Sequence, residues 1–249
     1  MKVGSSSISG NNVHQIDSLI DTLAAAHALG VEVILVSSGA MATAYPLLGF
    51  DRRPTDLASL QASAAVGQSR LMWRYQNALD QYDILAGQVL LTSSDMENPV
   101  SRDNARQAMD RLFELRILPI VNENDAVATY EIRFGDNDRL AALVAELVEA
   151  DALVLLSDVD AIYTKPPHLP GAERVAEVRS AADLSRIEVG VHDTGGVSTG
   201  GASTKLAAAQ HAAHAGTSTL ITATPLLADA LAGADVGTWF PSATAAHES

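Results

Sequence analysis

The chain alternates short apolar segments, typical of buried strands, with longer segments whose apolar residues recur at helical spacing. Helical stripes occupy residues 16–24, 57–79, 105–113 and 140–148, and an Ala-rich helix is predicted to begin at Lys205. The predicted strands are residues 31–36, 84–92, 118–121, 152–156, 220–221 and 239–240. This alternation predicts a mostly parallel sheet with right-handed crossovers and helices on both faces. We therefore expect an α/β fold, a three-layer αβα sandwich, formed as a single domain over residues 1–249.

Polar turns follow three of the predicted strands, at Ser37, Asn122 and Ser157. Because ligands collect beyond the carboxyl ends of parallel strands, all three turns should open on one edge of the sheet. Two crowded patches of short polar side chains, residues 122–125 and 135–138, are joined by a β-like run over 126–134. Composition alone leaves two readings of these patches open: ordinary turns with a helix cap, or a binding site.

Composition excludes several classes of function. The net charge of −14 argues against a nucleic-acid partner, which needs clustered Lys and Arg. The lack of Cys rules out thiol catalysis and Cys-ligated zinc. No apolar run is long enough to span a membrane and no leader is recognisable, so we expect a soluble protein without membrane contacts, located in the cytoplasm.

Two lysines, Lys2 and Lys205, stand in settings rich in Gly, Ser and Thr. Small residues let an anion approach backbone N–H groups, and a nearby ammonium group suits phosphate. For either segment alone, a flexible loop with a solvated lysine is the commoner explanation. The P-loop pattern and the Gly-x-Ser-x-Gly elbow are absent. His211 and His214 share a helix face with no carboxylate expected nearby, so no metal site is predicted.

The order of the motifs is more specific than any one of them. Seven motifs occur in sequence: KVGSS at 2–6, VSSGA at 36–40, AVGQ at 65–68, NENDAVA at 122–128, GDND at 135–138, LSDVD at 156–160 and TGGASTK at 199–205. Together they resemble the glutamate 5-kinase family of the amino acid kinase superfamily, over nearly the whole chain. The pair at 122–125 and 135–138 favours this family over kinases of acetylglutamate, carbamate, aspartate or uridylate.

The resemblance implies transfer of a phosphoryl group from ATP to the side-chain carboxylate of L-glutamate, giving glutamyl 5-phosphate for proline synthesis. It implies catalytic roles for Lys2, Lys205 and Asp138, and glutamate binding by Ser38, Asp125 and Asn137. The implied nucleotide-binding residues are Lys2, Ser157, Asp158, Thr199, Gly200, Gly201, Ala202, Ser203, Thr204 and Lys205. The implied Mg²⁺ would be held mainly through phosphates and water, with no protein ligand. A carboxylate is already ionised at neutral pH, so the reaction needs no general base.

Family members are homo-oligomers, so the resemblance also implies a dimer or tetramer. It further implies feedback inhibition by proline and a functional link to glutamyl phosphate reductase. We expect no C-terminal RNA-binding-type domain in residues 1–249.

The sequence also departs from the family pattern. Only Met1 precedes Lys2, so we expect the first strand to be almost absent, apolar surface to be exposed and Lys2 to be poorly anchored. Ala161 stands where the family has Gly, and Lys165-Pro166-Pro167 replaces its usual Asp-Pro region, which leaves the nucleotide preference open. Two alternatives therefore remain: a kinase of this fold acting on another acid, and a non-catalytic sensor of glutamate or proline.

Overall fold

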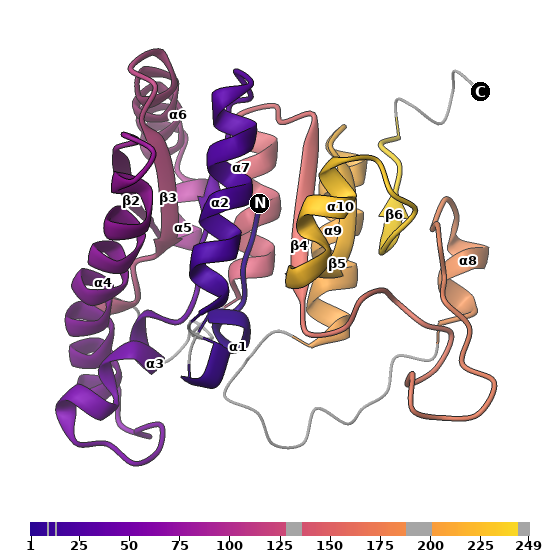
Figure 1. The fold of residues 1–249 in the computed structure, drawn as a ribbon, viewed down its shortest axis with the longest axis horizontal. Helices are drawn as coiled ribbons and strands as arrows, with labels where there is room; N and C mark the ends of the chain where they lie inside the picture. The colour runs from indigo at the N-terminus through magenta and orange to yellow at the C-terminus, as the bar shows by residue number, and fades with distance from the viewer. Residues whose placement is uncertain (9, 13, 128–135, 188–200, 244–249) are drawn as a thin grey trace.

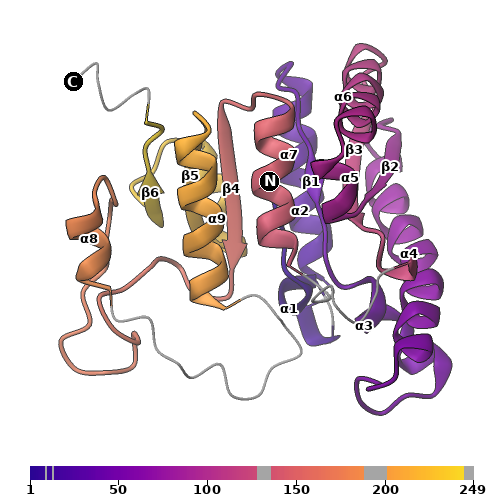
Figure 2. The same cartoon turned by 180° about the vertical axis from the view of Figure 1, so that it is seen from behind.

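A computed structural model describes residues 1–8, 10–12, 14–127, 136–187 and 201–243. Two sets of three strands run through the middle of the molecule (Figures 1 and 2). In the first set, β3 (Leu118–Glu123) lies between β1 (Leu35–Val36) and β2 (Ala86–Leu91), and all three strands are parallel. In the second, β5 (Ser218–Ala223) pairs in parallel with β4 (Ala152–Ser157) and antiparallel with β6 (Thr238–Phe240). The mostly parallel sheet predicted from the sequence is confirmed.

The first three residues join the two sets of strands. Lys2 forms parallel bridges to both Val36 of β1 and Leu155 of β4. On the β4 side, the Lys2 N–H donates to the Val154 carbonyl at 2.8 Å, and the Leu156 N–H donates to the Lys2 carbonyl at 2.9 Å. The segment Met1–Val3 therefore completes a continuous sheet with the order β2-β3-β1-(1–3)-β4-β5-β6.

The first strand is almost absent, as expected, since Lys2 forms only isolated bridges, but the expectation that Lys2 would be poorly anchored is wrong. Three residues are enough, because the neighbouring strands supply hydrogen-bonding partners on both sides. Val3 is fully buried and Lys2 is 4% exposed, so this part of the sheet leaves no open apolar gap.

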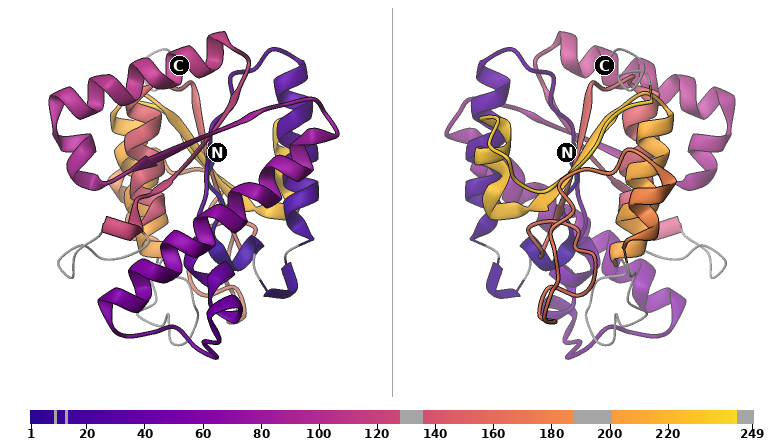
Figure 3. Two further views of the ribbon diagram at one scale, coloured as in Figure 1. Left: turned by 90° about the vertical axis from the view of Figure 1, so that its left-hand side faces the viewer. Right: turned by 90° about the vertical axis from the view of Figure 1, so that its right-hand side faces the viewer.

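Helices cover both faces of the sheet, which gives the expected three layers (Figure 3). One face carries α2 (Gln15–Ala28), α4 (Leu57–Asp80) and α10 (Leu227–Leu231); the other carries α6 (Pro99–Glu114), α7 (Asn137–Leu147) and α9 (Ala202–His214). Alternate strand residues point to opposite faces. Ile120 and Val154 pack in the core with α2 and α4, whereas Val121 and Leu155 pack in the core with α7 and α9.

Short elements connect these layers: α1 (Ser5–Ile8), η1 (Gly10–Asn12), α3 (Ala40–Ala44), η2 (Pro46–Leu48), α5 (Ser93–Glu97), η3 (Asp125–Val127), α8 (Ala181–Ser185) and η4 (Thr224–Leu226). Among the described residues, no helix combines the length and apolar character that crossing a membrane requires.

The helix ends follow local chemistry. The Asp56 side chain caps α4 by accepting from the Ser59 N–H at 2.8 Å, and Asp136 caps α7 by accepting from the Arg139 N–H at 3.2 Å. Gly30 takes a positive φ of 86° just beyond α2, as expected for the residue that ends a helix. The capped first turns of α7 and α4 lie at the same end of the sheet as the polar turns (Figure 1).

Among the predicted elements that differ from the structure are the strand at 31–36, the helix at Lys205 and the β-like run at 126–134. The strand expected at 31–36 is paired only at Leu35 and Val36, since Val31 lies half-exposed outside the ladder. Helix α9 begins at Ala202 rather than Lys205. The β-like run at 126–134 begins instead with the 3₁₀ turn η3, and its residues 128–134 lie outside the described part of the chain.

Candidate functional site

The polar turns predicted to meet at one sheet edge do so. β1, β3 and β4 are parallel in the continuous sheet; Ser37 directly follows β1, and Asn122 and Ser157 lie in the carboxyl ends of β3 and β4. The N-termini of α7 and α9 lie at the same edge (Figure 2). Backbone N–H groups at helix N-termini favour anions, so this edge suits phosphate and carboxylate groups.

A buried cluster of charges lies between the two helix N-termini. Lys2 Nζ is 2.7 Å from Asp138 Oδ1, and Lys205 Nζ is 3.1 Å from Asp138 Oδ2. The Thr204 hydroxyl donates to Asp138 Oδ2 at 3.0 Å. Both lysines are less than a tenth exposed, and Asp138 is 1% exposed. The three residues predicted to be catalytic are therefore in direct contact.

The pKa values in this cluster reflect burial and mutual attraction. Burial alone would raise the pKa of Asp138, but the ammonium groups of Lys2 and Lys205 hold it below its ordinary value. Burial lowers the pKa of Lys2, and the Asp138 carboxylate opposes that change. Asp138 thus remains ionised at neutral pH and holds two ammonium groups at one point.

A second cluster, made of amides and hydroxyls, surrounds Asn137. Asn137 Nδ2 lies 2.8 Å from the Ser37 carbonyl, 2.9 Å from Ser38 Oγ and 2.9 Å from Asn122 Oδ1. Asn137 Oδ1 is buried and makes no hydrogen bond within the described part of the protein. The nitrogen of this amide is thus fully engaged by the protein, and its oxygen is the atom left to accept from a ligand.

Four residues that support this cluster, Ser37, Gln68, Tyr75 and Asn122, were not predicted as site residues. Asn122 Nδ2 donates to Gln68 Oε1 of α4 at 2.8 Å, and the Ser37 hydroxyl hydrogen-bonds the Tyr75 hydroxyl of the same helix at 2.7 Å. Burial raises the pKa of the Tyr75 phenol above its ordinary value. Ser37, Asn122 and Gln68 belong to motifs that carry the family resemblance, and Ser37 and Asn122 also follow predicted strands as polar turns; no such signal marked Tyr75 in the sequence.

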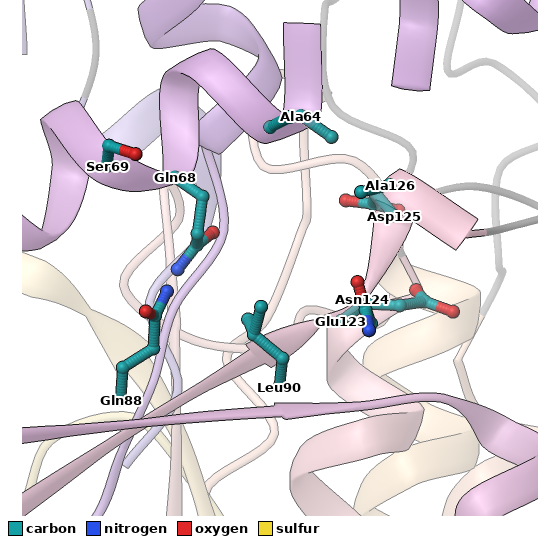
Figure 4. A pocket seen from close by; sticks show the side chains of 10 residues that line it. Ala64, Gln68, Ser69, Gln88, Leu90, Glu123, Asn124, Asp125 and Ala126 are labelled. Carbon is teal, nitrogen blue, oxygen red and sulfur yellow. The ribbon is translucent and has the colours of Figure 1, made fainter. Parts of the chain in front are cut away.

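The predicted substrate-binding residue Asp125 lies in η3, against α4. It is 6% exposed, and its Oδ1 makes no hydrogen bond within the described residues. Burial, followed by the neighbouring Glu123, raises the pKa of Asp125 to about 7, while Arg53 opposes this rise. Asp125, Glu123 and Gln68 line a cavity of about 200 Å³ between α4, β2 and η3 (Figure 4).

The predicted nucleotide-binding residues are only partly tested by the geometry. Asp158 accepts from the Ser7 hydroxyl at 3.2 Å, which connects the turn after β4 to α1. Gly201 precedes α9, and Ala202, Ser203, Thr204 and Lys205 form its first turn. Ser157 Oγ accepts from the Val159 N–H at 3.4 Å. Thr199 and Gly200 lie outside the described residues.

The described residues contain no cluster of three or more His, Asp or Glu side chains suited to a metal ion. The expectation that His211 has no carboxylate nearby is wrong, since His211 Nε2 lies 2.8 Å from Glu146 Oε2. Glu146 comes from α7 and also binds Arg102 of α6 at 2.9 Å, so this contact depends on helix packing rather than sequence proximity.

Comparisons with known proteins agree with this geometry. The model of the amino acid kinase family matches residues 1–223. A curated relative named glutamate 5-kinase, from Leifsonia xyli subsp. xyli, is 62% identical over 250 residues, covering 100% of this chain and 93% of that protein. Another protein of that name, from Streptomyces coelicolor, is 51% identical over 244 residues, covering 96% of this chain and 65% of its own length.

Solved structures support the fold. Carbamate kinase from Giardia lamblia bound to AMP-PNP superposes with a TM-score of 0.65 at 16% identity, covering 97% of this chain and 96% of that one. UMP kinase from Ureaplasma parvum superposes with a TM-score of 0.61 at 15% identity, covering 96% of each chain. The chain therefore belongs to the amino acid kinase family, and its relatives place it among the glutamate 5-kinases.

Proposed function

We propose that this protein transfers the γ-phosphoryl group of ATP to the side-chain carboxylate of L-glutamate, forming L-glutamyl 5-phosphate in the first step of proline synthesis. The observation that carries the proposal is the buried contact of Lys2 and Lys205 with one carboxylate, Asp138, at the edge of the sheet. The identity to curated glutamate 5-kinases over the whole chain supports the choice of substrate.

The two lysines neutralise charge on the phosphoryl group during transfer. Phosphoryl transfer depends mainly on positioning and electrostatic stabilisation, and the attacking carboxylate needs no base. Asp138 holds both ammonium groups at fixed positions before ATP arrives, so little reorganisation is needed in the transition state. Asp138 acts through the lysines, and the lysines contact the phosphoryl group.

The substrate amino acid is bound on the other side of α7's first turn. Two buried oxygens, Asn137 Oδ1 and Asp125 Oδ1, make no hydrogen bond within the described residues. Buried acceptor atoms without a hydrogen bond suit a ligand that brings N–H donors, such as the ammonium group of an amino acid. Ser38 lies beside Asn137 and adds a hydroxyl for the same ligand.

The nucleotide is proposed to lie along the turn after β4 and the first turn of α9. This region includes Ser157 and Asp158 together with residues 199–205. Mg²⁺ is proposed to be held through phosphate oxygens and water, because Asp138 already uses both of its oxygens on lysines. When bound, the metal supplies further neutralisation of phosphate charge.

An assay of acyl phosphate formation tests this function directly. Purified protein with ATP, Mg²⁺ and L-glutamate should yield an acyl phosphate that hydroxylamine traps as a hydroxamate. Acetylglutamate, aspartate and carbamate should each give far less trapped product, and UMP, whose phosphorylation forms no acyl phosphate, should release far less ADP than glutamate does. A clear preference for one of these acceptors would assign the chain to another activity of the same fold, and binding of glutamate without any turnover would indicate a sensor.

We also propose that the enzyme is a homo-oligomer in the cytoplasm, that proline inhibits it, and that its product passes to glutamyl phosphate reductase. An acyl phosphate hydrolyses readily in water, which favours prompt consumption by a reducing enzyme. Light scattering coupled to size-exclusion chromatography measures the oligomeric state. Titration of proline into the hydroxamate assay at sub-saturating glutamate measures the inhibition.

A further inference from the structure

Gln68 belongs to the AVGQ motif at 65–68, to which neither the fold nor the reaction gives a role. It lies on α4 opposite the end of β3, and its side chain reaches from the helix toward the sheet (Figure 4). Gly67, directly before it, lets α4 approach α3 closely: a Cβ atom there would lie 1.7 Å from the Ala40 carbonyl oxygen. The backbone that carries Gln68 is thus held at close range to the site.

A chain of amides connects Gln68 to the proposed substrate-binding residues. Gln68 Oε1 accepts from Asn122 Nδ2 at 2.8 Å, and Asn122 Oδ1 lies 2.9 Å from Asn137 Nδ2. Asn137 Nδ2 in turn reaches Ser38 Oγ at 2.9 Å. Asn122 and Asn137 are 1% and 2% exposed, so water cannot readily replace any of these contacts.

Backbone partners identify the oxygen and the nitrogen of each amide. Asn122 Oδ1 accepts from the Glu123 N–H at 2.8 Å, so its nitrogen must point to Gln68. Asn137 Nδ2 faces the Ser37 carbonyl, which only accepts, so the Asn137 oxygen must point away from the protein partners. In this arrangement Gln68 Oε1 is the acceptor that keeps the Asn122 nitrogen from being buried without a partner.

We propose that Gln68 is a positioning residue for amino acid binding: by holding Asn122 in one orientation, it keeps Asn137 turned so that its oxygen faces the substrate. This inference rests on the proposed function. Without the Gln68 acceptor, Asn122 Nδ2 would be buried without a hydrogen-bond partner. The Asn122 amide would therefore rotate or shift toward the cavity beside α4. That movement withdraws one of the three acceptors that fix Asn137.

The test is a kinetic comparison of Gln68→Leu with wild-type protein. The KM for glutamate should rise about tenfold, the effect of one lost buried hydrogen bond, while kcat and the KM for ATP stay within about threefold. Gln68→Glu keeps an acceptor oxygen near Asn122, so its KM for glutamate should lie closer to wild type than that of Gln68→Leu.

Gln76→Leu is the matched control. Gln76 is on the same helix and its amide is also hydrogen-bonded, donating to the Ile84 carbonyl and accepting from the Ala86 N–H. Its loss should lower the melting temperature without changing the KM for glutamate. If Gln76→Leu raised that KM as much as Gln68→Leu, the effect of Gln68 would be general helix stability and the proposal would fail.

A double variant tests whether Gln68 acts through Asn122. Adding Gln68→Leu to Asn122→Ala should change the KM for glutamate by less than about twofold, because the intermediate link is already gone. Full additivity, or a KM for ATP that rises with the KM for glutamate, would overturn the proposal. If Gln68→Leu does not fold, Gln68→Asn can replace it, because its side chain is shorter by one methylene and moves the acceptor away from Asn122. This variant should likewise raise the KM for glutamate and leave the KM for ATP unchanged. Wild-type protein without kinase activity in the same assay would refute the proposed function instead.

Discussion

The first turn of α7 carries two neighbouring residues whose surroundings are opposite in character. Asp138 is paired by charge: each of its oxygens lies within salt-bridge distance of an ammonium group, although Oδ1 makes no hydrogen bond within the described residues, and its pKa is held below its ordinary value. Asn137 and nearby Asp125 each keep a buried oxygen without a hydrogen bond in the described structure, and the pKa of Asp125 is raised to about 7. The carboxylate of Asp138 is paired with its counter-ions before any ligand arrives, whereas these oxygens of Asn137 and Asp125 would gain their partners from a bound ligand.

This difference matches what each region must do. Transfer of a phosphoryl group gains most from charges that are already in place, since reorganisation would add to the barrier. Recognition of an amino acid gains from polar atoms that cost free energy until the correct ligand pairs with them. We infer that the lysine cluster determines kcat and that the Asn137–Asp125 region determines the KM for glutamate.

The largest expected effect follows from Asp138→Asn. Two buried lysines would lose their shared counter-ion, so kcat should fall at least about 100-fold and unfolding should become easier by about 3–5 kcal/mol. Steady-state kinetics and thermal unfolding measure the two effects.

Glu146→Gln provides a matched control on the same helix. Glu146 also contacts two nitrogen-bearing side chains, Arg102 and His211, but it is 31% exposed and lies away from the sheet edge. This change should leave kcat unaltered and cost at most about 1 kcal/mol. Equal losses of kcat in the two variants would mean that the Asp138 cluster merely ties helices together.

The next largest effect is expected for Asp125→Asn. Loss of the carboxylate should raise the KM for glutamate by about 10- to 100-fold, as for a hydrogen bond to a charged group, while kcat changes much less. A change confined to kcat would assign Asp125 to the catalytic cluster. It would contradict the inference that the Asn137–Asp125 region determines the KM for glutamate.

Asp125→Asn should also make the folded protein more stable at pH 8. The folded pKa of about 7 lies above the ordinary 3.8, so the native state binds the extra proton between these values and loses stability as pH rises through this range. Asn removes this dependence. Thermal unfolding at pH 5 and pH 8 should show a smaller decrease in melting temperature for the variant than for wild type.

The pH profile of kcat/KM for glutamate tests whether Asp125 must be ionised to bind the substrate. Binding of an ammonium group requires ionised Asp125, so kcat/KM should increase with pH through a single ionisation near 7. The Asp125→Asn variant should lack this inflection. An inflection that persists in the variant would assign it to a different group.

The smallest effect is expected for Ser38→Ala. The Ser38 hydroxyl accepts from Asn137 and contributes one neutral hydrogen bond, so the KM for glutamate should rise about fivefold. The KM for ATP should not change. Substrate titrations at saturating concentration of the other substrate separate the two constants.

Much of this arrangement could be predicted from the sequence. The alternation of strand and helix patterns correctly predicted a parallel sheet with helices on both faces, and the polar residues Ser37, Asn122 and Ser157 meet at one edge of the sheet, as predicted. The family motifs brought together Lys2, Asp138 and Lys205, although Lys205 and Asp138 are 67 residues apart.

The features that were missed depend on packing between distant segments. The pairing of residues 1–3 with both β1 and β4 could not be read from a segment with so few apolar residues, because its partners supply the hydrogen bonds. The contact between His211 and Glu146 requires α7 and α9 to pack side by side. Gln68 was visible only as part of a motif, because its role depends on the orientation of the Asn122 amide.

The most direct test of the account is the division between kcat and KM in Lys205→Met, a change that keeps most of the side-chain length and removes the charge. If the lysine cluster carries phosphoryl transfer, kcat should fall at least about 100-fold while the KM for glutamate stays within about threefold. A variant that keeps its kcat and instead binds glutamate poorly would contradict the account.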